Sequence, residues 1–244
     1  MRLLVSVRSA AEVAAAVAGG ADIVDAKEPA LGSLGMVSGR VLREIAQDVP
    51  AGVPLSIALG DPRNVPALET AMAALDGLAP RPSRVYVKIG LSAAGDGPEA
   101  LLGALVDLAS RTAIRPSVVA VAYADHAAAG APAPEVVVRL AAATGAEGVL
   151  LDTWAKDSGD LFHHLSEPAL RAWIGQARAA GLLVALAGSL SIEGVRAVAE
   201  LPTDIVGVRG AACIGGRAGV VSEGRVAVLK AALTHGALPW PAGA

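Results

Sequence analysis

Short runs of apolar, often β-branched residues alternate along the whole chain with alanine-rich segments of helical periodicity. Runs this short, bounded by amphipathic helices, are typical of buried parallel strands. We count eight of them and predict strands at RLLVSV (2–7), ADIVDA (21–26), PLSIAL (54–59), RVYVKI (84–89), SVVAVAYA (117–124), GVLLDT (148–153), LLVALAG (182–188) and DIVGVR (204–209).

The segments between these runs carry helix signals. In SAAEVAAAVAGG (9–20), Ser9 can cap the helix and Glu12 follows three residues later, which is the spacing of a capping box. The segment SEPALRAWIGQARAAG (166–181) ends on Gly181, as helices commonly do.

Eight strand and helix rounds in 244 residues predict a single α/β domain, a (β/α)8 TIM barrel over residues 1–244. A short proline-bounded tail begins at about residue 236. A doubly wound open sheet is the alternative, but it usually has fewer strands. No GxGxxG follows the first strand to support dinucleotide binding.

Composition narrows the possible partners. The chain is 54% hydrophobic but only 2% aromatic, so its core is built from Ala, Val, Leu and Ile. A net charge of −3 offers no footprint for nucleic acid or an acidic membrane. Arg8 and Glu12 interrupt the apolar N-terminus before it reaches the length of a membrane span. The one cysteine, Cys213, excludes an internal disulfide. We therefore expect a cytoplasmic protein with a small-molecule partner.

Lysine is rare in this chain, which has sixteen arginines and four lysines. Three of the lysines lie at or just beyond the C-terminal end of a predicted strand: Lys27, Lys88 and Lys156. Lys230 falls in the last helix, where we expect it to be solvated. Barrel active sites occupy the C-terminal face, and even-numbered strands contribute side chains to common layers, so the three strand-end lysines can converge.

A chain that otherwise uses arginine keeps lysine where a neutral amine is needed, because an ammonium loses its proton when buried or crowded by other cations. The simpler interpretation is that these lysines bind phosphate as point charges or are solvated.

Carboxylates follow the same strand ends: Asp25, Asp61, Asp125 and Asp152. Asp25 and Lys27 are two residues apart and so project to the same side of a strand. A carboxylate favours the charged amine, so we expect Asp25 to move protons or orient Lys27 rather than lower its pKa. For Asp61, in LGDP, ordinary turn chemistry is an equal explanation.

The last two strand ends, AGSL (187–190) and GVRGAACIGG (207–216), are rich in glycine. Loops after strands 7 and 8 of a barrel often bind phosphate through backbone N–H groups. We predict a phosphate site at Gly188, Ser189, Arg209 and Gly210, although Arg209 could instead pair with a carboxylate. His163 and His164 are adjacent and point apart, and neither His126 nor His235 has an evident partner, so we predict no metal site.

Several stretches, in order over nearly the whole chain, resemble one family. They are LLVSV, GGADIVDAKEPALGSLG, YVKIGL, YAD, LLDTWAKD, LFHHLS, ALAGSL and DIVGVRGAAC. The resemblance is to the (5-formylfuran-3-yl)methyl phosphate synthases of methanofuran biosynthesis. Archaeal members have Asp-x-Lys-Asn-Pro where this chain has Glu28 in place of the asparagine.

The resemblance implies a TIM-barrel lyase of one-carbon metabolism. It would join two molecules of glyceraldehyde 3-phosphate with loss of phosphate and water, without a metal or organic cofactor. The family's Schiff-base lysine falls on Lys27 and its proton acceptor on Lys88. Asp25, Asp152 and Lys156 match its other active-site positions. Barrels of this sort are commonly oligomeric, so we expect a homo-oligomer.

Three alternatives stay open at this point. The chain could be a class I aldolase acting on another sugar phosphate, which would share the imine at Lys27. It could be a phosphosugar isomerase whose lysines only bind phosphate. It could also be a non-enzymatic scaffold, although a scaffold gives no reason for three of four lysines to gather at one face.

Overall fold

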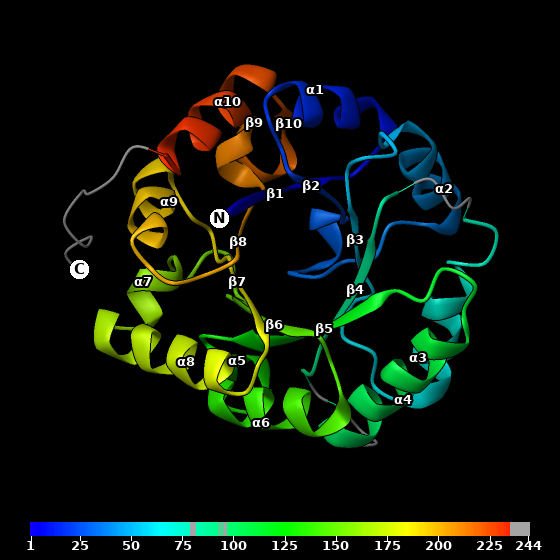
Figure 1. Cartoon of the computed structure of the whole chain (residues 1–244). Coiled ribbons are helices and arrows are strands. Elements are labelled where there is room, and N and C mark those ends of the chain that lie inside the picture. The colour runs from blue at the N-terminus through cyan, green and yellow to red at the C-terminus, as the bar shows by residue number, and fades with distance from the viewer. Residues whose placement is uncertain (79–81, 93, 95–96, 235–244) are drawn as a thin grey trace.

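The structure is a computed structural model that describes residues 1–78, 82–92, 94 and 97–234. Eight parallel strands pair in sequence order and close into a barrel (Figure 1). They are β1 (Arg2–Val7), β2 (Ile23–Ala26), β3 (Leu55–Ala58), β4 (Val85–Gly90), β5 (Ser117–Tyr123), β6 (Gly148–Asp152), β7 (Leu183–Leu186) and β8 (Ile205–Val208). The tail from about residue 236 and His235 lie outside the described residues.

Helices surround the barrel and cover the outer face of its strands, as Figure 1 shows. The longer ones are α1 (Val13–Ala18), α2 (Gly39–Asp48), α3 (Val65–Ala73), α4 (Pro98–Arg111), α6 (Pro134–Thr144), α8 (Glu167–Ala179), α9 (Ile192–Ala199) and α10 (Glu223–Ala232). Two short helices, α5 (His126–Ala129) and α7 (Leu161–His164), lie in the loops after β5 and β6. None of the helices within the described residues is both long and apolar enough to cross a membrane.

The predicted barrel is confirmed, because β8 pairs with β1 and so leaves no open edge. Several strands are shorter than predicted. Asp22 and Asp204 precede β2 and β8, and their carboxylates accept hydrogen bonds from the backbone N–H groups of Leu3 and Val184, at 2.6 and 2.8 Å. At the start of these two strands a carboxylate thus accepts a hydrogen bond from the neighbouring strand, and the regular backbone pairing begins at the residue after the aspartate.

The predicted helix ends differ in outcome. Gly181 follows α8 with φ +75°, the left-handed conformation expected of a glycine after a helix, so this prediction is confirmed. The capping box at Ser9 is wrong, since the Ser9 side chain caps nothing. Glu12 instead accepts a hydrogen bond from the Arg8 N–H and is otherwise bound to Arg209.

The core has two parts. Most of the apolar side chains fill the layer between strands and helices. A smaller group lies inside the barrel, where Ile23, Tyr86 and Ile205 close the interior near the N-terminal ends of the strands. Nearer the C-terminal ends several inward-facing side chains are small: Ser6, Ser56, Ala185, Ala187 and Gly207. Such small side chains cannot fill the interior, so this end of the barrel is hollow.

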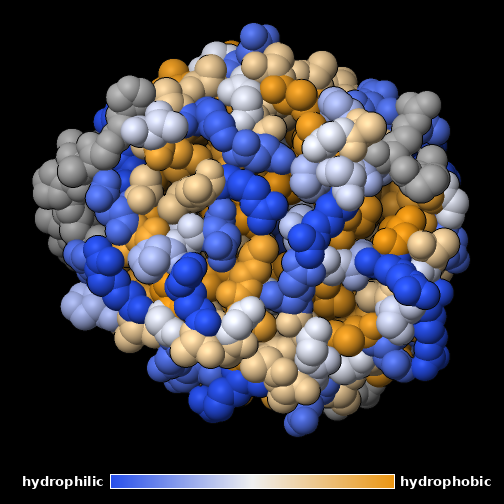
Figure 2. Space-filling model, in the orientation of Figure 1, coloured by the Kyte–Doolittle hydropathy of each residue, from blue (hydrophilic) through white to orange (hydrophobic). Residues whose placement is uncertain are grey.

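Two segments partly cover the hollow end. The loop after β2 contains η2 (Pro29–Leu31) and buries Leu34 against the barrel interior. After β8 the chain forms η3 (Gly210–Ala212), a hairpin of β9 (Cys213–Ile214) and β10 (Val220–Val221), and η4 (Gly216–Ala218) between these two strands. Polar side chains surround patches of apolar surface on the face seen in Figure 2.

Candidate active site

A cavity of about 520 Å³ occupies the hollow end of the barrel. The three strand-end lysines all line it, together with Asp25 and Asp152. The structure therefore brings together side chains that are up to 131 positions apart, counting from Asp25 to Lys156. Lys230 lies on α10 outside the barrel, where it pairs with Asp22 rather than being fully solvated.

Asp25 and Lys88 form an ion pair inside the barrel. Lys88 Nζ lies 2.7 Å from Asp25 Oδ1, and their side chains are 5% and 0% exposed. The hydroxyl of Ser6, on the neighbouring strand β1, donates to Asp25 Oδ2 at 2.7 Å. Burial alone would raise the pKa of Asp25, but Lys88 and Lys27 outweigh it and hold the pKa below its ordinary value. Asp25 is therefore a carboxylate in the resting site.

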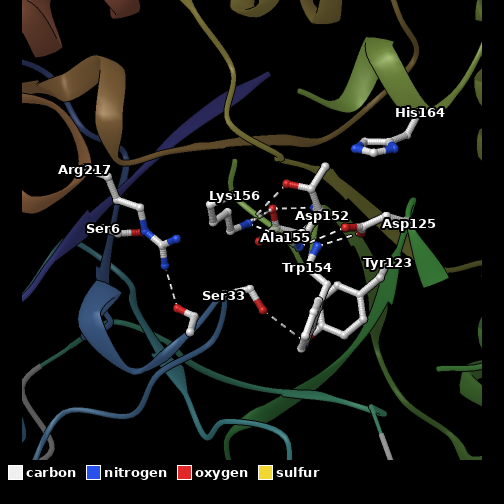
Figure 3. A network of polar contacts seen from close by, with 12 residues as sticks. Ser6, Ser33, Tyr123, Asp125, Asp152, Trp154, Ala155, Lys156, His164 and Arg217 are labelled. Atoms are coloured by element: carbon white, nitrogen blue, oxygen red, sulfur yellow. Dashed lines mark hydrogen bonds and ion pairs between the residues drawn. The ribbon is translucent and has the colours of Figure 1, made fainter. Parts of the chain in front are cut away.

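Asp152 and Lys156 form a second pair at the end of β6. Lys156 Nζ donates to Asp152 Oδ1 at 2.8 Å and also to the carbonyl of Thr153 (Figure 3). Burial would raise the pKa of Asp152, but Lys156 and Lys27 lower it overall. Asp152 is thus also a carboxylate, and Lys156 is held close against the strand end that carries it.

Asp125 fixes the loop that carries Lys156. Its two carboxylate oxygens accept the backbone N–H groups of Trp154 and Ala155, at 2.7 and 2.8 Å. Figure 3 shows these contacts beside the Asp152 and Lys156 pair. The strand-end position of Asp125 was a signal in the sequence, but its partners are backbone groups that no spacing rule identifies.

Lys27 lines the same cavity and interacts electrostatically with both pairs. Its backbone N–H donates to the Val7 carbonyl at 3.0 Å, which extends the β1–β2 ladder past Ala26. The Lys27 side chain therefore faces inward, on the same side as that of Asp25. The Lys27 ammonium makes no hydrogen bond or salt bridge with the described residues, and the side chain is only 9% exposed.

The pKa of Lys27 is correspondingly lowered, to about 8. Burial is the largest cause of the lowered pKa. The charges of Lys88 and, to a smaller extent, Lys156 lower it further, whereas the carboxylates of Asp152 and, to a smaller extent, Asp25 raise it. About a tenth of Lys27 is consequently a neutral amine at pH 7, far more than for an ordinary lysine. The expectation that Asp25 does not lower this pKa agrees with the direction of its effect.

The two glycine-rich turns lie side by side on the cavity wall. Gly188 and Ser189 both have positive φ, +113° and +51°, so the turn after β7 is left-handed at two successive residues. The backbone N–H groups of Gly188, Ser189 and Gly210 donate to no acceptor among the described residues. These donors are therefore available to an anion in the cavity.

Arg209 requires a correction, because it has no donor left for a phosphate. Its guanidinium forms a buried, two-pronged ion pair with Glu12, at 2.6 and 3.0 Å. Its remaining N–H groups donate to the carbonyls of Ser6, Arg217 and Gly219. All five donors of an arginine are thus used. The alternative that Arg209 pairs with a carboxylate is the one the structure contains.

A further polar cluster was not recognised from the sequence. The Tyr123 hydroxyl lies 2.9 Å from Asp61 Oδ1 and accepts a hydrogen bond from Ser33 in the loop after β2. A side chain at Gly90 would collide with Asp61 and Tyr123, which explains the glycine. Burial raises the pKa of Asp61 despite the Tyr123 hydrogen bond. Asp61 therefore does more than form a turn.

Arg217 is a second cavity residue that the sequence did not reveal. It lies one position beyond the glycine-rich stretch 207–216. The two histidines of the short helix α7, His163 and His164, do not line the cavity, and His164 Nε2 lies 3.3 Å from the Ser158 hydroxyl. No cluster of three or more histidine, cysteine or acidic side chains within the described ranges could hold a metal ion.

Solved structures with the same fold include sugar phosphate enzymes. Phosphoribosyl anthranilate isomerase from Thermus thermophilus superposes with a TM-score of 0.62 at 19% identity, covering 96% of this chain and 98% of that one. For 3-hexulose-6-phosphate synthase the TM-score is 0.60 at 18% identity, covering 95% and 99%. Identities this low show the shared barrel alone.

Sequence comparison is more specific. The family model described as 4-HFC-P synthase matches residues 3–230. The chain is 37% identical over 228 residues to a (5-formylfuran-3-yl)methyl phosphate synthase of Methanococcus maripaludis (strain C6), covering 93% of this chain and 94% of the relative. It is 35% identical over 245 residues to the Archaeoglobus fulgidus protein of the same name, covering 97% and 100%. The chain therefore belongs to the 4-HFC-P synthase family, the (5-formylfuran-3-yl)methyl phosphate synthases.

Proposed function

We propose that this enzyme of methanofuran biosynthesis is a lyase that joins two molecules of glyceraldehyde 3-phosphate through a Schiff base on Lys27. The observation that carries the proposal is the state of the three cavity lysines. Lys88 and Lys156 are each paired with a carboxylate, whereas Lys27 has no such partner and a pKa of about 8. Lys27 is therefore the amine best suited to attack a carbonyl carbon.

The imine would activate the triose bound to it. A protonated imine withdraws electrons from the adjacent carbon, so a proton there becomes acidic and the resulting carbanion can attack the aldehyde of the second triose. Phosphate elimination, ring closure and dehydration then need repeated proton transfers.

The Lys88 and Asp25 pair is our proposed proton acceptor. An ammonium paired with a carboxylate cannot itself accept a proton, so the pair has to act as a unit. Lys88 donates one proton toward Asp25 or the substrate and then takes another from the carbon. Asp152 and Lys156 form an equivalent pair for the later proton transfers. Lys156 Nζ lies 2.8 Å from Asp152 Oδ1, so these two groups can also exchange a proton directly.

The backbone N–H groups of Gly188, Ser189 and Gly210 are our proposed site for one substrate phosphate. They are unused by the protein and lie on the cavity wall. Arg209 is no longer part of this site. We infer no metal or organic cofactor for the reaction, since imine chemistry supplies the electron sink.

Incubation with glyceraldehyde 3-phosphate, with and without borohydride, tests the proposal by mass spectrometry. We expect the furan aldehyde phosphate in solution and a reduced adduct on the peptide containing Lys27. An adduct without furan would indicate an aldolase of another specificity. Turnover to an isomerised sugar phosphate without an adduct would indicate an isomerase. The absence of both the product and the adduct would contradict the imine mechanism.

Two expectations about the protein's surroundings stay predictions. The homo-oligomer can be checked by light scattering coupled to gel filtration. Cytoplasmic location can be checked by cell fractionation with an antibody against the protein.

A further inference from the structure

Arg217 is the cavity arginine whose role the proposed chemistry leaves open. Its side chain is partly buried and lines the cavity. One N–H of its guanidinium donates to the Gly32 carbonyl, in the loop after β2. No carboxylate within the described residues lies close enough to form a salt bridge with it, and its other donors have no partner there.

The backbone of the hairpin that carries Arg217 is held in place by the buried Arg209. Gly215 and Gly216 adopt positive φ of +85° and +68°, which turns the chain back between β9 and β10 just before Arg217. The carbonyls of Arg217 and Gly219 accept hydrogen bonds from the buried Arg209.

Glu12 completes this support. Besides its two-pronged pair with Arg209, it accepts the backbone N–H of Val221, in the second strand of the hairpin. The hairpin is therefore held at both ends of the turn that carries Arg217. A group held in place before the ligand arrives loses little conformational freedom on binding, which favours affinity.

The Arg217 backbone lies beside Gly210, but its side chain extends from there to another part of the cavity rim, at the Gly32 carbonyl. Gly188 and Ser189 follow β7, whereas the Arg217 side chain extends from the β8 hairpin toward the loop after β2. In Figure 3 it enters opposite Asp125 and His164. Arg225, also in the lining, is exposed on α10. The cavity thus has a second edge where a fixed cation with unused donors can meet an anion.

We propose that Arg217 binds the phosphate of the second triose, the one that is not joined to Lys27. This proposal rests on the proposed function, in which two phosphorylated trioses occupy one cavity and need two anion sites. Guanidinium donors match phosphate oxygens in pairs. The glycine turn includes the buried Gly188, so it suits the triose that binds first, and the half-buried Arg217 suits the one that binds over it.

The test separates the one-triose step from the two-triose step. Borohydride trapping of the adduct at Lys27 needs one triose, whereas furan formation needs two. For Arg217→Gln we expect the rate of trapping to stay within about twofold of wild type. The triose concentration that half-saturates furan formation should rise about tenfold or more, because a charge-assisted hydrogen bond to the phosphate is lost. Arg217→Lys keeps the charge and should recover part of it. Arg139→Gln, on the exposed face of α6, is the matched control and should change neither.

Two outcomes would overturn the assignment of Arg217 while leaving the proposed function intact. One is furan formation by Arg217→Gln with the wild-type concentration dependence. The other is an equal loss of trapping and furan formation, which would place Arg217 at the first triose. If the wild-type enzyme traps triose but forms no furan, the proposed function and the second-triose site fail together.

Discussion

Asp25 pairs with Lys88 on β4, 2.7 Å away, and not with Lys27, which is two residues from it and directly follows β2. This choice of partner decides the chemistry of the site. It satisfies Lys88 and leaves Lys27 as a buried amine without an anion in contact. The pairing of Lys156 with Asp152 repeats the arrangement across the cavity.

The rate of imine formation should follow the ionisation of Lys27. Its pKa is about 8, so the neutral fraction of the Lys27 amine rises about tenfold between pH 7 and pH 9. We expect the initial rate of borohydride trapping at limiting triose to rise with a midpoint near pH 8. Asp152→Asn removes the carboxylate that most favours the charged amine, so its midpoint should lie at lower pH. A midpoint near that of a free lysine would contradict the lowered pKa.

Lys27→Met should make the protein more stable while abolishing product formation. Burial disfavours the ammonium, and methionine fills similar volume without a charge, so we expect a gain of about 1–3 kcal/mol at pH 7, or a few degrees in Tm. Thermal unfolding followed by circular dichroism measures this. Lys230→Met, which removes the lysine outside the cavity, is the control and should change stability by less than about 1 kcal/mol.

The same group makes wild-type stability depend on pH. The folded-state pKa of Lys27 is lowered from 10.5 to about 8, so between these values the unfolded chain binds more protons and stability rises with pH. The advantage of Lys27→Met should therefore shrink from pH 8 upward. An advantage that stays constant up to pH 10 would show that the ammonium is not its cause.

Breaking the Glu12 and Arg209 pair should be costly. Both side chains are almost fully buried, 3% and 4% exposed, so either Glu12→Gln or Arg209→Met leaves a charge without its partner. We expect each single change to lower the free energy of unfolding by about 3–5 kcal/mol. The double variant should lose less than the sum of the two in urea titrations, and additive losses would argue against a coupled pair.

Asp125→Ala should loosen the loop that carries Lys156. It removes two acceptors for backbone N–H groups, so we expect a stability loss of about 1–3 kcal/mol. Furan formation should slow about tenfold or more because Lys156 is displaced, whereas trapping at Lys27 should persist. Asp107→Ala, which removes an exposed carboxylate from α4, serves as the control. Unchanged furan formation in Asp125→Ala would show that the loop does not need this support.

The sequence by itself determined the barrel and the residues that meet inside it. Eight apolar runs separated by helices have one compact closed arrangement, and the two-residue period of a strand fixes which side chains face inward. Asp25, Lys27 and Lys88 could therefore be assigned to one cavity from their positions at strand ends.

Only the tertiary structure decided which of these side chains pair. The contact of Asp25 with Lys88 depends on the register and spacing of separate strands, and that of Arg209 with Glu12 joins residues 197 positions apart. Arg217 enters the cavity from a hairpin with no chemical signature in the sequence. Local patterns set the direction of a side chain, but long-range geometry and burial set its partner and hence its protonation.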